Sequence, residues 1–342
     1  MCYVELKKNK QNILTPLRLI RMNFKNTNIY MYNLSIIFKN CSFVETSVYG
    51  NGNSVSSVYF INIFCSGERN IELIVQKYAK LFIQNCVFEN IVTEYKLSLI
   101  TATTILEIFI RKCSFRTIIG SVVEAKFSAH ILFKQVLFTN INPFTEAEAE
   151  SSPIQTSYAS IVYFLNSKFI KSSGKNGGVI SLLRIKSVAV SSSYFLFNKA
   201  SGNGSSLFLE NVSFLRILKT SFELNTAKIC GGAVFSRAKM YDNQIVVSQC
   251  LFRKNSAEKG GGAVYSKMVD VVFVSNCKYI ENFAVVGGAL YITKADSYSQ
   301  MKTLFISNKG IGNGGSIYTR RCSLLYVHGC VFFKKYCSWL DL

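Results

Sequence analysis

An internal repeat is the feature that most constrains what this chain of 342 residues can fold into. In five successive segments of the second half, an aromatic residue is followed three positions later by Asn, and a glycine comes eight or nine positions after the aromatic. The clearest segment has Phe252 and Asn255 ahead of Gly261-Gly-Ala-Val-Tyr265. Self-similarity at a fixed period is typical of stacked units that bury their apolar faces only against one another.

The aromatic residue serves as an anchor from which the repeat extends through most of the chain. The eleven anchors are 23 to 31 residues apart, apart from one interval of 45: Phe43, Phe88, Phe115, Phe138, Phe169, Phe195, Phe222, Phe252, Tyr279, Phe305 and Phe332. Of the 22 residues that lie seven and five positions before an anchor, only Gln300 is polar. Residues two apart share one face of a strand, whereas a helical repeat would need a spacing of 3.6.

This spacing predicts a coil of three short strands. Positions −7 and −5 lie on one strand, positions −2 and 0 on a second, and the step of three between them implies a bend. A third strand begins at the glycines. Such a coil buries its inner face only when coils stack about 4.8 Å apart, and parallel crossovers are right-handed in nearly all cases. The sequence therefore predicts an all-β fold, a right-handed parallel β-helix of about 11 coils.

The repeat predicts one β-helix domain over 1–342. Within it, 1–35 is expected to be irregular or a partial coil, 36–159 to hold degenerate coils with loop insertions, and 160–335 to hold regular coils. Glu45–Asn70 and Asn142–Ser157 do not fit a coil and are expected to project as loops. A further coil around Leu17 and Phe24 stays open because its spacing of 19 residues is short. The chain is interpreted as part of a longer protein.

The polar residues that recur are interpreted as structural. Asn at position +3 is expected to form a ladder of side-chain amides between coils. Its members are Asn198, Asn225, Asn255, Asn282 and Asn308. Glycine pairs suit positive-φ corners or close backbone approach. These structural glycines are Gly177, Gly178, Gly231, Gly232, Gly261, Gly262, Gly287, Gly288, Gly314 and Gly315.

Cysteine recurs at position −2, which suggests either disulfides between neighbouring coils or a ladder of buried thiols. The column comprises Cys41, Cys86, Cys113, Cys250, Cys277 and Cys330. Ser167, Ser193 and Thr220 take the same position in other coils, which favours a small side chain, and hence thiols. The chain has 11 Cys, so they cannot all pair within one chain. With two His and no Cys-x-x-Cys, we expect no metal site and no cofactor.

Three of the four Asp recur nine or ten residues before an anchor and are expected to stack on one edge. Asp242, Asp270 and Asp296 are the weak alternative for a catalytic site, because carboxylates on successive coils could serve a glycosidase or bind a cation. Lys239, Lys267 and Lys294 precede them by two or three residues, which favours a solvated turn with compensated charge.

Lys and Arg exceed the acidic residues 39 to 19, giving a net charge of +20. Such an excess favours an anionic partner, but these cations are scattered over turns and codon bias toward Lys explains them equally well. No run of 18 apolar residues exists that would cross a membrane as a helix, and no secretory signal is visible.

The paired motifs Phe-x-x-Asn and Gly-Gly-Ala-[Val/Leu], closest between Phe195 and Tyr318, resemble the repeats of polymorphic outer-membrane proteins. Those repeats fall within the pectin lyase-like β-helix superfamily, and similar ones occur in surface proteins of single-celled eukaryotes. The resemblance implies an extracellular, surface-attached protein used for adhesion, generally without catalysis. The same superfamily holds pectate lyases and polygalacturonases, but this chain lacks their adjacent Asp pair and their Gly-His-Gly.

The resulting hypothesis is a non-catalytic region of a surface or secreted protein, acting as scaffold or adhesin. The alternatives are a polysaccharide lyase or glycoside hydrolase and a basic-surface binder of anionic glycans. Its partner is unknown: surface glycans or other proteins are considered, with no specific nucleic acid. Anchoring to a membrane would need segments outside this sequence.

Overall fold

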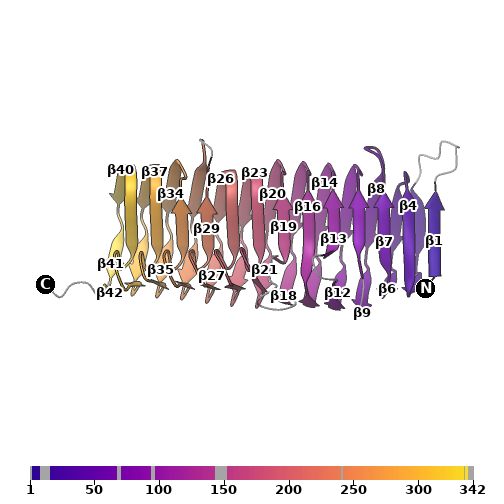
Figure 1. Ribbon diagram of the computed structural model, residues 1–342, viewed down its shortest axis with the longest axis horizontal. Helices are drawn as coiled ribbons and strands as arrows, with labels where there is room; N and C mark the ends of the chain where they lie inside the picture. The colour runs from indigo at the N-terminus through magenta and orange to yellow at the C-terminus, as the bar shows by residue number, and fades with distance from the viewer. Residues whose placement is uncertain are drawn as a thin grey trace.

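A computed structural model of the chain describes residues 2–7, 16–67, 71–93, 97–142, 152–239, 242–334 and 336–337. Its coils stack in one long row, with β1 (Cys2–Lys7) and β42 (Tyr336–Cys337) at opposite ends (Figure 1). The strand pairs of the described residues are parallel and join neighbouring coils, as in Phe222↔Phe252. The expected all-β solenoid of about 11 turns is confirmed, and the described residues contain no helix.

The strands form three parallel sheets that run the length of the row. The largest has 22 strands and takes two segments from most coils, one after the glycines and one holding positions −7 and −5. Its strands are β1, β2 (Leu17–Ile20), β4 (Thr27–Tyr32), β5 (Ile36–Lys39), β7 (Ser47–Asn51), β8 (Ser57–Ile61), β10 (Leu73–Gln76), β11 (Lys80–Gln84), β13 (Ser98–Thr103), β14 (Glu107–Arg111), β16 (Ser121–Lys126), β17 (His130–Lys134), β19 (Ile154–Ser157), β20 (Ile161–Leu165), β23 (Ile180–Ser191), β26 (Leu207–Leu218), β29 (Val234–Arg237), β30 (Gln244–Ser248), β33 (Val264–Lys267), β34 (Val271–Ser275), β37 (Leu290–Met301) and β40 (Ile317–His328).

The second sheet, which we call the anchor sheet, has 13 strands and carries the anchors. Its strands are β3 (Asn23–Lys25), β6 (Ser42–Val44), β9 (Phe64–Gly67), β12 (Val87–Val92), β15 (Ser114–Ile119), β18 (Leu137–Asn142), β21 (Lys168–Ile170), β24 (Tyr194–Leu196), β27 (Ser221–Glu223), β31 (Leu251–Arg253), β35 (Lys278–Ile280), β38 (Leu304–Ile306) and β41 (Val331–Phe333). Its neighbours follow chain order, so each coil adds one strand.

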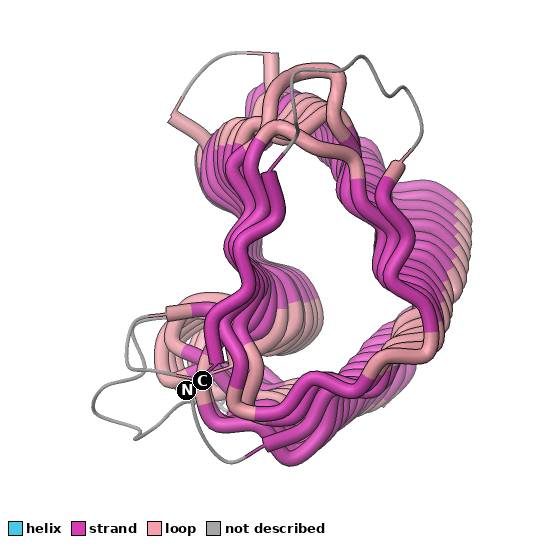
Figure 2. Tube along the Cα trace, turned by 90° about the vertical axis from the view of Figure 1, so that its right-hand side faces the viewer, coloured by secondary structure: helices cyan, strands magenta, loops and turns pink. Residues whose placement is uncertain are grey.

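The third sheet has seven strands of two residues and belongs to the regular coils of the second half. Its strands are β22 (Ser173–Gly174), β25 (Lys199–Ala200), β28 (Thr226–Ala227), β32 (Ser256–Ala257), β36 (Phe283–Ala284), β39 (Lys309–Gly310) and β42. Seen along the long axis, successive coils superimpose and the three sheets form the walls of a tube (Figure 2).

The bend expected between positions −5 and −2 is a single residue in the left-handed conformation. Position −3 has a φ of 45° to 60° in every coil: Arg21, Asn40, Asn62, Asn85, Lys112, Gln135, Asn166, Ser192, Lys219, Gln249, Asn276, Lys302 and Gly329. Only one is Gly and five are Asn, the non-glycine residue that best tolerates this region. One left-handed residue turns the chain from the large sheet into the anchor sheet.

Side chains at positions −7, −5 and 0 fill the tube. From Ile36 to Phe305 the described anchors and both apolar columns are buried. Consecutive anchor rings stack, with centroids 4.8 Å apart for Phe195–Phe222 and again for Phe222–Phe252. The core is therefore a set of continuous columns, each made of one position of the repeat.

The expectation that Glu45–Asn70 projects as a loop is wrong for residues 45–67, while residues 68–70 lie outside the described residues. Residues 47–67 form a complete coil of β7, β8 and β9, and Cys65 takes the anchor register between Phe43 and Phe88. A buried cysteine at an anchor position leaves no aromatic signal in the sequence. The earlier coil that was left open also exists, because Phe24 pairs with Phe43. These two coils bring the anchor sheet from 11 to 13 strands.

The second expected loop, Asn142–Ser157, is strand at both ends. Asn142 closes β18, and Ile154–Ser157 is β19, which pairs with β16 and β23. Residues 143–151, which hold the rest of that expected loop, lie outside the described residues.

Candidate functional site

The repeated Asn side chains form a continuous, fully buried hydrogen-bond ladder. The Asn198 amide nitrogen Nδ2 donates to Asn225 Oδ1 at 3.0 Å, and Asn225 donates to Asn255 at 2.9 Å. Asn255 donates to Asn282 at 3.0 Å, and Asn282 to Asn308 at 2.9 Å. Each Nδ2 also donates to the anchor carbonyl of the coil before, as Asn255 does to Phe222 at 2.9 Å. These amides are satisfied internally, so none is left to face a ligand.

The asparagines themselves are not the left-handed residues of this turn. Positive φ belongs to position +2, immediately before each of them: Phe197, Leu224, Lys254, Glu281 and Ser307. Holding such varied residues in that conformation costs free energy. The ladder's hydrogen bonds to backbone supply the compensation, as when Asn225 N donates to Asn255 Oδ1 at 3.2 Å.

The side chains at position −2 satisfy the backbone at the left-handed corner. Cys86 Sγ donates to the Gln84 carbonyl at 3.1 Å, and Cys277 Sγ to that of Ser275 at 3.2 Å. Ser193 Oγ donates to the Ser191 carbonyl at 2.9 Å, so hydroxyl and thiol make the same contact. Position −2 therefore requires a small side chain that donates a hydrogen bond, from either sulfur or oxygen.

Nine cysteines of the described part of the chain are free thiols. Cys41, Cys65, Cys86, Cys113, Cys250 and Cys277 are buried, whereas Cys230, Cys322 and Cys330 are partly exposed. Burial raises the pKa of the Cys65 thiol, and burial with a hydrogen bond to Cys113 raises that of Cys86. Protonated thiols are poor nucleophiles, so Cys65 and Cys86 are structural residues at neutral pH.

The two glycines of each pair are needed for different steric reasons. The first glycine of each pair has positive φ, as Gly261 does at 63°. The second lies where coils approach most closely: a Cβ on Gly262 would overlap the carbonyl oxygens of Gly288 and Phe283. Neither forms an open cradle of backbone amides.

The three aspartates do not form one column. The register places Asn243, not Asp242, beside Asp270, and Asp270 beside Asp296. Asp270 Oδ2 accepts from the Asn243 backbone nitrogen at 2.9 Å, which makes it a turn-stabilising residue. Asp242 and Asp296 are exposed. Asp242 lies ten residues before its anchor, whereas Asp270 and Asp296 lie nine before theirs, and this difference of one residue moves Asp242 out of register.

Among the described residues, no group of three His, Cys, Asp or Glu side chains could hold a metal ion. The same residues offer no helix of the length and apolarity that a membrane span needs.

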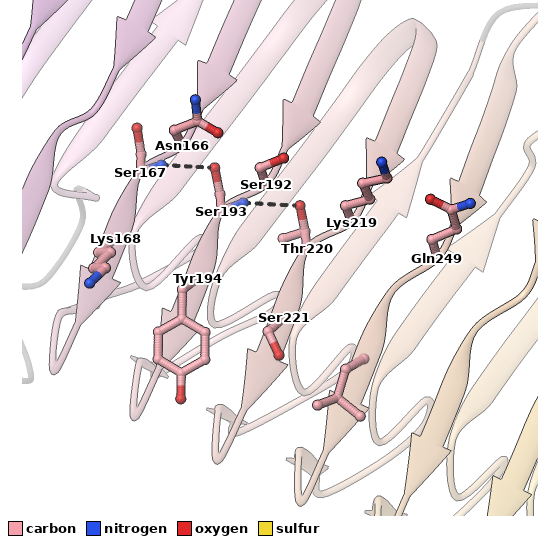
Figure 3. Close-up of a pocket in the computed structure, with 11 residues that line it drawn as sticks. Asn166, Ser167, Lys168, Ser192, Ser193, Tyr194, Lys219, Thr220, Ser221 and Gln249 are labelled. Carbon is pink, nitrogen blue, oxygen red and sulfur yellow. Dashed lines mark hydrogen bonds between the residues drawn. The ribbon is translucent and has the colours of Figure 1, made fainter.

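One shallow groove follows the corner between the large sheet and the anchor sheet over four coils (Figure 3). It is lined by Asn166, Ser192, Lys219 and Gln249 at position −3 and by Lys168, Tyr194, Ser221 and Leu251 at position −1. Its floor is position −2, where the Ser167 backbone nitrogen donates to Ser193 Oγ at 3.2 Å. That floor is already hydrogen-bonded, and the rim mixes amide, hydroxyl, aliphatic and ammonium groups without a convergent pair.

A second groove, of about 300 Å³, lies on the outer face of the strands that follow the glycines. Tyr265, Tyr291 and Tyr318 continue an outward ladder that begins with Phe208 and Phe235. Ring centroids are 4.6 Å apart for Tyr265–Tyr291 and 5.0 Å for Tyr291–Tyr318. Tyr265 and Tyr291 line the groove, and each has an aromatic ring on both of its sides: Phe235 and Tyr291 flank Tyr265, and Tyr265 and Tyr318 flank Tyr291.

Cations complete this second groove, which we call the tyrosine–cation groove. Lys267 and Arg320 lie two residues beyond Tyr265 and Tyr318, on the same face of their strands. Lys294 and Arg321 are left-handed residues, with φ of 55°, that kink β37 and β40. Thr293 completes the lining.

The sequence pattern did not mark the aromatic residue that ends each glycine-pair motif as part of a groove. Its signal was present, since Tyr265 and Lys267 recur as Tyr318 and Arg320 two coils later. The two neighbours Lys294 and Arg321 had no signal, because nothing in the sequence marks a left-handed kink at a basic residue.

Comparisons with known proteins point to surface proteins. The family described as "Chlamydia polymorphic membrane protein (Chlamydia_PMP) repeat" matches residues 249–267. The chain is 30% identical over 143 residues, 36% of its length, to "Probable autotransporter YfaL" of Escherichia coli K12, and covers 11% of that protein. It is 32% identical over 130 residues, 37% of its length, to "Metabotropic glutamate receptor-like protein R" of Dictyostelium discoideum, and covers 8% of that protein. The chain thus carries a polymorphic membrane protein repeat and spans about a tenth of each of these relatives.

Proposed function

We propose that this chain is a non-catalytic β-helix region of a surface or secreted protein, of the pectin lyase-like type, acting as a scaffold or adhesin. The observation that carries the proposal is the use of the recurrent polar residues. Asn255, Cys277 and Gly262 each serve a contact between coils, so the repeat builds a rod, and its recurrent residues form no reaction centre within the described part of the chain. The polymorphic membrane protein repeat and the likeness to an autotransporter support a surface location.

The location can be tested in cells that express the full-length gene. We expect antibodies raised against this chain to label intact cells, and an external protease to remove the label while a cytosolic protein stays uncut. Labelling only after permeabilisation would contradict the surface assignment, because a membrane would then separate the chain from its antibody.

Attachment needs a separate measurement, since a surface protein can be a passive scaffold. We expect beads coated with the purified chain to bind cell layers more than beads coated with its urea-unfolded form. Equal binding of both forms would remove the adhesin role and leave the scaffold role.

The competing class is a polysaccharide lyase or glycoside hydrolase. Asp242, Asp270 and Asp296 would be its catalytic residues, but two are exposed and the third holds a turn. We expect the purified chain to release no unsaturated or reducing ends from polygalacturonate, with or without calcium. Release that disappears in the triple alanine variant, while its circular dichroism is unchanged, would overturn the non-catalytic proposal.

The partners remain part of the same proposal. The excess of cationic side chains favours an anionic glycan on a neighbouring surface over an uncharged one, because the chain has 39 Lys and Arg and only 19 acidic residues. Membrane attachment would come from segments outside this sequence, and the proposed scaffold uses no cofactor.

A further inference from the structure

The tyrosine–cation groove differs in charge balance from other cationic parts of the surface. Further along the same outer face, Arg237 pairs with Glu210 at 2.5 Å, and Lys239 lies 3.9 Å from the same carboxylate. Lys267, Lys294, Arg320 and Arg321 form no ion pair within 4.0 Å with another described residue. Unpaired cations that share one groove repel each other, and an anion between them relieves that repulsion.

The groove follows the long axis of the solenoid. Its four cations come from three successive coils, β33, β37 and β40, whose aligned residues repeat about every 4.8 Å. Lys294, Arg320 and Arg321 are exposed, and Lys267 is half-buried. A linear polyanion lying along the solenoid would therefore meet a cation at each coil it crosses, whereas a compact anion would meet one or two.

The tyrosines supply hydrogen-bond donors beside these cations. Burial raises the pKa of Tyr265 to about 12, and burial followed by the neighbouring Tyr318 raises that of Tyr291. Both phenols are therefore protonated at neutral pH and can donate to an oxyanion. Arginine adds planar pairs of donors that match sulfate and carboxylate groups.

Ring geometry separates a glycan from a nucleic acid. Proteins that hold single-stranded nucleic acid stack its bases on free aromatic faces. Here Tyr291 has Tyr265 on one side at 4.6 Å and Tyr318 on the other at 5.0 Å, so its faces are covered. The groove offers charge and hydroxyl groups, which suit a chain whose anions are sulfates or carboxylates on sugar rings.

We propose that the tyrosine–cation groove, lined by Tyr265, Lys267, Tyr291, Lys294, Arg320 and Arg321, binds a linear polysaccharide that carries sulfate or carboxylate groups. This inference rests on the proposed surface function and assigns its binding site. A sulfated and a uronate glycan share the required chemistry, and a direct comparison separates them.

The test measures binding of the full chain to a heparin octasaccharide, an oligogalacturonate of equal length and a single-stranded oligothymidylate of equal charge. The variant is Lys294→Asn/Arg320→Gln/Arg321→Asn. Asparagine suits the two left-handed positions, because Asn211 already occupies the equivalent kink with a φ of 56°. The matched control, Lys112→Asn/Lys278→Gln/Lys302→Asn, removes three exposed charges elsewhere, two of them at left-handed corners.

We expect the groove variant to weaken binding of at least one glycan by about tenfold or more and the control by less than about threefold, with affinity falling steeply as salt is raised. The glycan that loses most identifies the natural charge type. Four results would overturn the proposal: no glycan binding by the unaltered chain, equal binding by variant and unaltered chain, equal loss in variant and control, or oligothymidylate binding as tightly as either glycan. Surface labelling of cells is independent of all four, so failure here leaves the proposed location standing.

Discussion

At the scale of single residues, stacking converts a local preference into a property of the whole column. One Asn in one turn would satisfy that turn alone, but in five coils each amide serves its own coil and the one before it. The benefit of each side chain depends on its neighbours having the same one. A substitution in the middle of a column therefore affects two contacts, whereas one at the edge affects one.

Replacing Asn255 by Ala should lower the free energy of unfolding by about 3 kcal/mol, because it leaves two buried polar groups of the preceding coil without a partner. Asn225 Nδ2 loses its acceptor at 2.9 Å, and the Phe222 carbonyl loses its donor. Urea denaturation followed by circular dichroism measures the change. Asn276→Lys is the control: it is an exposed corner position where Lys112 and Lys302 occur naturally, and it should change stability by less than about 0.5 kcal/mol. Equal effects of the two substitutions would show that the ladder adds nothing.

The single polar residue in the core columns has its own partner. Gln300 and Tyr298 are fully buried, and the Tyr298 hydroxyl donates to Gln300 Oε1 at 2.7 Å. Tyr298→Phe should destabilise the chain by about 1 to 3 kcal/mol, because it leaves a buried amide oxygen without that donor. The double variant Tyr298→Phe/Gln300→Val, which matches the all-apolar columns of other coils, should recover most of the loss. Additive losses in the urea-denaturation cycle would mean that the pair is not coupled.

At the scale of strands, residue spacing predicts side-chain direction but not the conformation that joins two strands. The columns at −7 and −5 could be recognised because a period of two is visible in any copy of the repeat. The coil ending at Cys65 could not, because its anchor is no longer aromatic. The sequence also did not predict that four coils would each have one continuous strand of 12 residues, kinked by a left-handed residue. These strands are β23, β26, β37 and β40, with the kinks at Arg184, Asn211, Lys294 and Arg321. Residue type does not reveal that conformation, since basic residues seldom adopt it.

The grooves could not be predicted from the sequence for the same reason. The tyrosine ladder follows from the repeat, because Tyr265, Tyr291 and Tyr318 hold one place in the motif. Which cations stand beside it depends on the left-handed kinks at Lys294 and Arg321. The prediction that the aspartates stack was wrong because of a difference of one residue, and a shift of one residue moves a side chain to the opposite face of a strand.

Close approach between coils predicts that the second glycine of a pair does not tolerate a side chain. Gly262→Ala should lower stability by about 2 to 3 kcal/mol, because its Cβ would overlap backbone oxygens that cannot turn away. Gly312→Ala is the control, since its nearest contact, the Val285 carbonyl oxygen, is 3.3 Å away. Thermal unfolding of both variants measures the difference. If the two melt together, the coils have freedom at Gly262 that the stacked backbone does not suggest.

At the scale of the whole molecule, the protein behaves as a one-dimensional stack. Each coil is stabilised by the coils on its two sides, so a coil with fewer neighbours should open first. The gradient is visible in exposure: Tyr298 is fully buried in its column, whereas Leu325, its equivalent one coil later, is 54% exposed. The apolar content of 49% is concentrated in this shared core, so stability depends on position along the rod as much as on residue type.

Hydrogen exchange should record that dependence. In this chain we expect amides of β26, which has paired coils on both sides, to be protected against exchange far longer than those of β40. The two strands have the same length and the same kink, so they form a matched pair within one molecule. Exchange followed by peptide mass spectrometry at neutral pH should show the ends opening before the middle. Equal protection of β26 and β40 would mean that the chain opens as one cooperative unit, and that coupling between coils exceeds the stability that each coil gains from its own contacts.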